Sequence, residues 1–261
     1  MSNIFAELQM QINVENNSMQ DARKQMNEIV RIFKLQNNYM EQLSYFAELR
    51  KGISVNTLIM ADAFMVDLDY PVIILPEELR HDSLGMCRGN SFVYAGRFVY
   101  PVKDVRGDVA GWCGYDKFED IKYLDSKNYG YKAKYSMLYG MEYMKNYYSN
   151  TAPIFITEGI VCALWLRQNG FNALALCGSY LSTYVIAILR RFGKRCIVVP
   201  DSDDAGNKLA EMSKRYLKDA RVIQSRIAKD IDDSQKVHKN LVQELLLYTT
   251  PFRSSKYFKD V

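Results

Sequence analysis

Short apolar runs alternate with helix-like patterns through the C-terminal half of the chain. The runs predict strands at residues 153–157, 173–177, 196–200 and 220–225, and the intervening and following segments predict helices at residues 159–169, 182–192, 204–218 and 232–247. Strands that alternate with helices in this way form parallel β-α-β units. The pattern therefore predicts an α/β domain with a parallel sheet at residues 151–247, followed by a frayed, basic tail at residues 248–261.

The N-terminal half has a different pattern. Residues 1–50 are rich in Gln, Asn, Met and Glu, and their apolar positions recur at helical spacing, which predicts helices that either pack on the body or form a partner-binding arm. Residues 51–150 predict a mixed α+β subdomain: a helix ends near Met65, and a second helix covers residues 137–148. Short β-prone runs lie between these helices, at residues 71–75, 91–94, 97–102 and 109–112.

Acidic residues follow the predicted strands of the C-terminal domain. Glu158 follows the first strand, Asp201 and Asp203 follow the third, and Asp230 and Asp232 follow the fourth. Because ligands bind in the crevice beyond the carboxyl ends of parallel strands, these carboxylates are expected to meet at one site. Crowded carboxylates need a cation or raised pKa values, and an all-oxygen ligand set suits Mg²⁺ or Mn²⁺.

A plainer interpretation of the same residues also exists. Asp and Ser are common caps at the start of helices, so Asp201, Ser202 and Asp203 are equally typical of the residues that begin the helix at Asp204. Asp233 has the same alternative role before the last helix. The acidic residues at two further strand ends, rather than the Asp-x-Asp spacing, favour a metal site.

Composition narrows the class of protein. The 261 residues are 48% hydrophobic and carry 34 basic and 30 acidic side chains, a net charge of +4 that alone does not indicate a nucleic-acid partner. Five cysteines lack C-x-x-C spacing and nearby histidines, so we expect no structural zinc. No signal peptide or membrane-spanning stretch is visible, so we expect a cytoplasmic protein with no membrane partner.

The acidic motifs, taken in order, resemble the Toprim fold. They are Glu158-Gly159, then Gly178-Ser179, then the Asp-x-Asp-x-Ala-Gly segment from Asp201, then the Lys-Asp-x-Asp-Asp segment from Lys229. The Toprim domain is shared by primases, topoisomerases, recombination mediators and some nucleases. This resemblance implies the fold and a Mg²⁺ site but names no reaction.

Segments upstream resemble the catalytic core of bacterial-type (DnaG-like) replicative primases. The segment from Arg97 to Gly114 is similar to the family's R-x-x-F-P-I-x-D…G…G-F-G-G motif, and the segment from Lys122 is similar to its K-Y-L-N-S motif. Residues 45–64 and 134–140 resemble two further motifs of the same family. The resemblance covers roughly residues 40–240 and keeps the family order.

The resemblance implies a DNA-directed RNA primase that makes short RNA primers on single-stranded DNA from ribonucleoside triphosphates. It assigns metal binding to five carboxylates, with Glu158, Asp201 and Asp203 as the catalytic set and Asp230 and Asp232 as a second pair. It assigns template or nucleotide contacts to Arg97, Lys122, Tyr123 and Lys134. It also implies a replicative helicase and a separately encoded zinc-binding module as partners, as expected for a compact viral or mobile-element version.

The chain departs from the family at several positions. Cys162 replaces an acidic residue of the E-G-x-x-D motif, Tyr115 replaces an arginine, and Val93 and Ala95 stand where basic residues are common. Two alternatives follow from these observations: a Toprim-type nuclease that uses the same metals to cleave DNA, and a non-catalytic DNA-binding replication subunit. The retained carboxylates favour the primase.

Overall fold

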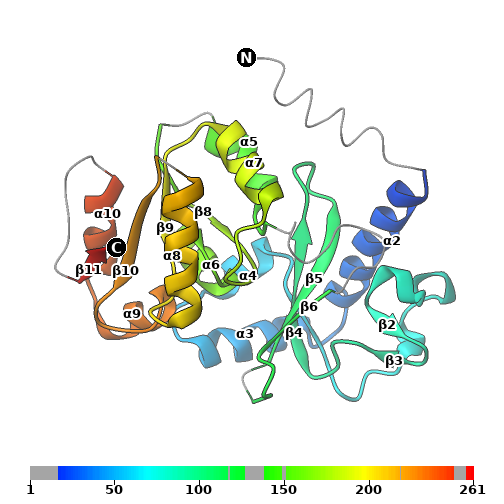
Figure 1. The fold of residues 1–261 in the computed structure, drawn as a ribbon. Helices are drawn as coiled ribbons and strands as arrows, with labels where there is room; N and C mark the ends of the chain where they lie inside the picture. The colour runs from blue at the N-terminus through cyan, green and yellow to red at the C-terminus, as the bar shows by residue number, and fades with distance from the viewer. Residues whose placement is uncertain (1–16, 117, 127–137, 149–150, 218, 250–256) are drawn as a thin grey trace. The chain divides into compact units, whose positions relative to one another are not determined.

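The computed structural model describes the chain except for residues 1–16, 117, 127–137, 149–150, 218 and 250–256. The chain forms two compact units (Figure 1). The first contains residues 1–46 and 58–134, and the second contains residues 47–57 and 135–261. Over the described parts of both units, no helix combines the length and the apolar character needed to cross a membrane.

The second unit is built on a sheet with the order β11-β10-β9-β7-β8. Its strands are β7 (Ile154–Thr157), β8 (Asn172–Ala175), β9 (Cys196–Val199), β10 (Arg221–Ser225) and β11 (Phe258–Asp260). Its helices are α5 (Met144–Tyr148), α6 (Ile160–Gln168), α7 (Thr183–Phe192), α8 (Asp204–Tyr216), α9 (Ile231–Val237) and α10 (Leu241–Thr249). The four strands β7 to β10 run parallel, with fully buried side chains on β7, β8 and β9, as the continuous apolar runs predict.

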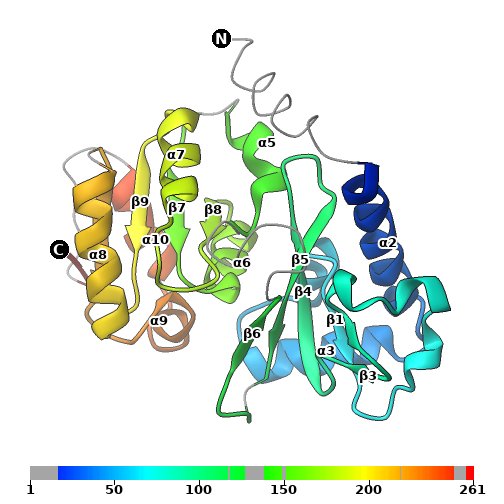
Figure 2. The same cartoon turned by 45° about the vertical axis from the view of Figure 1, so that its right-hand side comes forward.

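The strand order reverses between β7 and β9. The chain leaves β7 through α6 to pair β8 on one side, and it then crosses through α7 to pair β9 on the other side. Because parallel crossovers are right-handed, a change of direction places α6 and α7 on opposite faces of the sheet (Figures 1 and 2). Thr157 and Val199 are paired at the carboxyl ends of β7 and β9, and this switch point is where such sheets bind ligands.

A short N-terminal segment completes the second unit. The side chain of Gln168 on α6 hydrogen bonds to the backbone at both Gly52 and Ser54, over 2.9 Å and 2.7 Å. The amide of Gln235 on α9 donates to the carbonyl of Lys51 over 2.6 Å. Residues 47–57 are therefore tied to helices that come more than a hundred residues later in the chain.

The first unit contains an antiparallel sheet with the order β1-β4-β5-β6. Its strands are β1 (Phe64–Val66), β4 (Arg97–Lys103), β5 (Val109–Tyr115) and β6 (Tyr123–Asp125), with a small hairpin of β2 (Cys87–Arg88) and β3 (Ser91–Phe92). It also contains helix α2 (Asn17–Lys34). Helices α3 (Tyr39–Arg50) and α4 (Val55–Met60) are shared between the units, because the boundaries of the units fall within them. Helix α2 packs on β1 and β5, where the rings of Phe33 and Phe64 stack with centroids 4.5 Å apart.

The predicted fold class is confirmed, but three predicted elements are wrong. The run at residues 71–75 is a 3-10 turn at Val72–Ile74 between two prolines, and 74% of Ile73 is exposed, so the run has no buried face. The preceding helix ends at Met60, and residues 64–66 form β1. The helix predicted at residues 232–247 is divided into α9 and α10, because His238 has extended backbone angles.

The C-terminal tail is a fourth correction. The sequence predicts a frayed end, but Phe258–Asp260 forms β11, which pairs antiparallel with β10 at the edge of the sheet. Phe258 is buried, and Arg221 on β10 forms a bidentate ion pair with Asp260. An uncovered strand edge offers unpaired backbone groups, and β11 satisfies those of β10.

Candidate active site

Two acidic residues meet where β7 and β9 end. Glu158 directly follows β7, and Asp201 lies two residues after β9, beyond Pro200. The backbone N–H of Asp201 donates a hydrogen bond to Oε1 of Glu158 over 2.9 Å. The predicted convergence of these two residues at neighbouring strand ends is therefore present in the structure.

Asp203 and Asp230 cap the helices that leave the site. The carboxylate of Asp203 accepts the N–H of Gly206 at the start of α8 over 2.9 Å, and Asp230 accepts the N–H of Asp233 at the start of α9 over 2.7 Å. A Cβ on Gly206 would lie 1.9 Å from the carbonyl oxygen of Asp201, so this turn requires glycine. Asp203 and Asp230 thus cap helices and also belong to the acidic cluster, because the cap geometry holds both carboxylates at the same edge of the sheet.

Lys229 supplies positive charge to this cluster. Its ammonium lies 3.0 Å from Oδ2 of Asp203 and 3.6 Å from Oδ2 of Asp201. The hydrogen bond to Asp203 raises the pKa of Lys229, and the N–H of Gly206, together with Lys229, lowers the pKa of Asp203. One ammonium thus bridges two carboxylates.

The deeper carboxyls retain an excess of negative charge. Burial and the neighbouring charges of Glu158 and Asp230 raise the pKa of Asp201 to about 7. Burial also raises the pKa of Glu158 and of Asp230, although each accepts a backbone N–H that acts in the opposite direction. A cluster of oxygen ligands that resists ionisation in this way fits a hard divalent cation, which would relieve the repulsion.

Asp232 lies in a different environment from the other carboxyls. Only 1% of it is exposed, and its Oδ2 is 2.6 Å from a guanidinium nitrogen of Arg50 and 2.9 Å from the ammonium of Lys236. Its charge is therefore already balanced by two cations of the same unit. Sequence pattern could not identify Arg50 as a partner of Asp232, because Arg50 lies 182 positions earlier in the chain.

The predicted metal-binding carboxylates are not equally close together. Within the described part of the chain, one set of three offers ligand atoms that all lie within 4.8 Å of one another, and it consists of Asp230, Asp232 and Asp233. Glu158, Asp201 and Asp203 are more widely spread. The geometry brings Glu158 and Asp201 into contact and leaves Asp203 at the rim, bridged by Lys229.

Cys162 lies on α6 and is buried beneath the acidic cluster. Burial, followed by the charges of Asp230 and Asp201, raises the pKa of its thiol well above the ordinary value, so the thiol stays neutral. A carboxylate at this position would add a further negative charge to a crowded region. A neutral thiol at this position thus keeps the repulsion within the acidic cluster lower than a carboxylate would.

The predicted nucleic-acid residues lie in the first unit and differ in exposure. Lys122 is exposed, and Tyr123 on β6 is 38% exposed, with its ring 4.9 Å from that of its cross-strand neighbour Tyr115. Arg97 is buried, and its guanidinium donates to the carbonyl of Ile121 over 2.8 Å, so it supports the segment that carries Lys122. Lys134 lies outside the described residues.

The raised pKa values predict an unusual dependence of stability on pH. For a carboxyl whose pKa rises on folding, stability is fully present below the unfolded pKa of 3.8 and is lost as the pH rises through the folded value, about 7 for Asp201. In chelator-treated buffer, the free energy of unfolding should fall by about 2–3 kcal/mol from pH 5 to pH 8 because of this group. Urea denaturation at the two pH values measures the change.

Asp201→Asn is the matched control for this prediction. The variant lacks the titrating group, so its free energy of unfolding should fall much less between the same two pH values. Added Mg²⁺ or Mn²⁺ should reverse most of the wild-type decrease, since a ligand that binds the folded state stabilises it. An equal decrease in wild type and variant would contradict the prediction.

Comparison with protein families and curated proteins supports the resemblance. Residues 155–235 match the family model described as Toprim-like. The DNA primase of Legionella pneumophila is 33% identical over 120 residues, which cover 45% of this chain and 21% of that protein. The DNA primase of Thermotoga maritima is 32% identical over 134 residues, covering 50% and 24%. The chain thus spans less than a quarter of the length of these curated relatives.

Solved structures show a similar fold over most of the chain. The RNA polymerase domain of the Mycobacterium tuberculosis primase DnaG matches with a TM-score of 0.73 and 16% identity, covering 90% of this chain and 85% of that one. The Aquifex aeolicus primase, solved with its zinc-binding and RNA polymerase domains, matches with a TM-score of 0.74 and 20% identity, covering 90% and 62%. A DnaG catalytic domain bound to single-stranded DNA has a TM-score of 0.71 and 20% identity, covering 87% and 78%.

Proposed function

We propose that this chain, which carries a Toprim-like segment and has the fold of bacterial primase catalytic cores, synthesises short RNA primers on single-stranded DNA. The reaction is metal-dependent nucleotidyl transfer, in which a 3′-hydroxyl attacks the α-phosphate of a ribonucleoside triphosphate and pyrophosphate leaves. The observation that carries the proposal is the meeting of Glu158 and Asp201 at the switch point of the sheet, with Asp203 and Asp230 beside them.

The acidic residues divide into two roles under this proposal. Glu158, Asp201 and Asp230 hold Mg²⁺ or Mn²⁺, and Asp203 completes the set from the rim when Lys229 moves its ammonium to a phosphate. A bound divalent ion supplies Lewis-acid stabilisation of charge on the attacking and leaving oxygens. Asp232, which the family resemblance places among the metal ligands, instead shapes the site through its pairs with Arg50 and Lys236.

The first unit supplies nucleic-acid contacts under the same proposal. Lys122 offers an exposed ammonium to a phosphate, which positions a strand without reading its sequence. Tyr123 offers a partly exposed ring on which a base can stack. Arg97 acts indirectly, by holding the backbone at residues 121 and 122. A helicase and a separate zinc-binding module are proposed partners by family resemblance alone.

A single assay tests the proposal against its alternatives. The protein is incubated with single-stranded DNA, the four ribonucleoside triphosphates and either Mg²⁺ or Mn²⁺, and both the RNA products and the DNA are resolved on a denaturing gel. New short RNA that requires metal supports the primase. Cleaved DNA without new RNA would support the nuclease, and DNA binding without either product would support a non-catalytic subunit.

Tyr123→Ala should weaken binding to single-stranded DNA by about five- to tenfold, because base stacking on an aromatic ring contributes about 1–3 kcal/mol and part of this ring already packs on Tyr115. Fluorescence anisotropy with a labelled oligonucleotide measures the affinity. Tyr123→Phe keeps the ring and should bind like wild type. The matched control is Tyr45→Ala, which removes an exposed tyrosine from α3, and an equal loss in this variant would contradict the assignment.

A further inference from the structure

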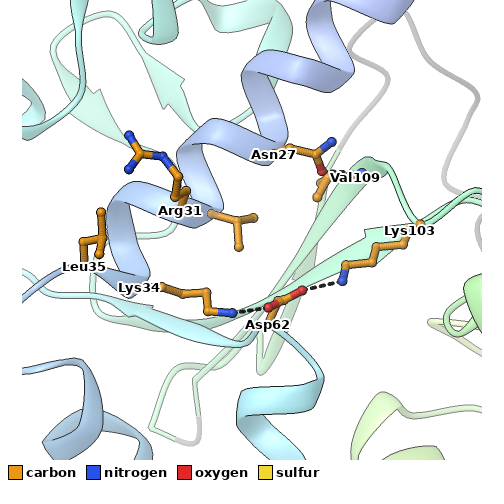
Figure 3. Close-up of a pocket in the computed structure, with 9 residues that line it drawn as sticks. Asn27, Arg31, Lys34, Leu35, Asp62, Lys103 and Val109 are labelled. Atoms are coloured by element: carbon orange, nitrogen blue, oxygen red, sulfur yellow. Dashed lines mark hydrogen bonds and ion pairs between the residues drawn. The ribbon is translucent and has the colours of Figure 1, made fainter.

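A cavity in the first unit is lined by charged groups that the proposed reaction does not use. Its volume is about 530 Å³, and it lies between α2, the residue Asp62 that follows α4, and the hairpin that joins β4 to β5. Figure 3 shows Lys34 and Lys103 approaching Asp62 from opposite sides. Volumes of a few hundred to about 1,000 Å³ are usual for sites that bind small molecules.

The three charged groups form an ion triad with a net charge of +1. Lys34 donates to one carboxylate oxygen of Asp62, and Lys103 donates to the other. Burial opposes ionisation of Asp62, but the two lysines hold its pKa below the ordinary value, so its carboxylate stays charged near neutral pH. Asp62 thus fixes two ammonium groups in place beside the cavity.

The ammonium groups retain capacity to bind a further acceptor. Each ammonium has three N–H donors, and among the residues that the structure describes each lysine uses one of them on Asp62, which leaves two on each. Arg31 also lines the cavity but is paired with Glu28 over 2.7 Å, so its charge is largely balanced. An anion with several oxygens matches this arrangement better than a monovalent carboxylate.

We propose that this cavity binds a phosphate group, which the ammonium groups of Lys34 and Lys103 contact while Val30, Leu35 and Val109 provide an apolar wall for the sugar or base of a nucleotide. The residues of this cavity belong to the first unit, whereas those of the acidic cluster belong to the second, so the two sites share no residue. Binding at this cavity requires no divalent metal. The inference therefore does not depend on the proposed primer synthesis and can succeed or fail without it.

Binding measurements in the presence of a chelator test the proposal. Full-length wild type is compared with Lys34→Gln and Lys103→Gln, using inorganic phosphate, ATP and a single-stranded oligonucleotide as probes in isothermal titration calorimetry. The control is Lys24→Gln, because Lys24 lies on the same helix as Lys34, has 79% of its side chain exposed and pairs with Asp21 rather than with Asp62. Chelation removes the metal-dependent route for triphosphate binding at the acidic cluster.

The expected result is affinity about tenfold weaker in both cavity variants and unchanged in Lys24→Gln. Weaker binding of inorganic phosphate and ATP identifies a free nucleotide as the source of the phosphate. Weaker binding of the oligonucleotide alone, with a salt slope smaller by about 1, identifies the nucleic-acid backbone. Unchanged affinity for every probe, or an equal loss in Lys24→Gln, overturns the proposal and leaves the triad as a structural feature.

A second measurement uses wild-type protein and covers variants that fail to fold. Lysine acetylation with a chemical reagent is quantified by mass spectrometry with and without ATP, again in chelator. ATP should slow acetylation of Lys34 and Lys103 at least several-fold relative to Lys24. The same effect of ATP on all three lysines, or no effect on any of them, would overturn the proposal independently of any substitution.

Discussion

Asp201→Asn is expected to lower metal-dependent primer synthesis by roughly 10²–10³-fold. Asp201 combines burial with close approach to Glu158, and its raised pKa shows how strongly the folded protein opposes its charge. The amide keeps the size of the side chain but removes the charge that a divalent ion would neutralise, and a metal ion supplies several kcal/mol of transition-state stabilisation. The initial rate of RNA synthesis on a single-stranded template, with saturating Mg²⁺ or Mn²⁺, measures the loss.

Asp219→Asn is the matched control, because Asp219 is an exposed aspartate of the same unit, near the carboxyl end of α8. Its rate should stay within about twofold of wild type, as surface substitutions rarely have large effects. The Asp201 variant should also gain stability at pH 8, which separates loss of activity from loss of folding. Activity that persists in Asp201→Asn would remove this carboxylate from the proposed metal site.

Arg50→Ala should lower the free energy of unfolding by about 3 kcal/mol. The pair of Arg50 with Asp232 is buried, with 14% and 2% of the two side chains exposed, and removal of one partner leaves a buried carboxylate with less compensation. Lys236 also pairs with Asp232, which keeps the expected loss at the low end for broken buried pairs. Urea denaturation followed by circular dichroism measures the total change, and hydrogen exchange should show greater opening of α9.

The double variant Arg50→Ala with Asp232→Asn tests the cause of this loss. Removing the stranded charge as well should recover part of the stability, so the double variant should be more stable than Arg50→Ala alone. Arg31→Ala breaks the exposed pair with Glu28 and should leave the free energy of unfolding almost unchanged, because exposed pairs contribute little. A similar small cost for Arg50→Ala would mean that the buried pair contributes little.

Much of the second unit follows from local sequence pattern. The strands β7, β8 and β9 are continuous apolar runs buried on both faces, so their positions could be predicted to within about two residues. β11 could not, because Phe258–Asp260 becomes a strand only by pairing with β10, more than thirty residues earlier. The run at residues 71–75 has the composition of a strand, but it lies between two prolines and exposes Ile73, and it forms the 3-10 turn Val72–Ile74.

Part of the candidate site likewise follows from local sequence pattern, and part depends on contacts between residues far apart in the sequence. Glu158 and Asp201 were predictable, because both follow apolar runs whose carboxyl ends must meet in a parallel sheet. The sequence pattern could not predict which of the carboxylates are paired with a lysine or arginine of the chain and which are not. The partners that decide this for Asp232 are Lys236, one helical turn away, and Arg50, which no local spacing connects to it.

The pairing of residues 47–57 with α6 and α9 has a consequence for synthesis on the ribosome. This segment emerges early, yet Gln168, Asp232 and Gln235, to which it binds, are translated more than a hundred residues later. The nascent chain must therefore keep the segment undocked while the intervening residues 58–134 are made, and the first unit can fold in that interval. The second unit can complete its structure only after α9 has left the exit tunnel. Because residues 47–57 are also part of this unit, expressing residues 135–261 alone should yield an incompletely folded product.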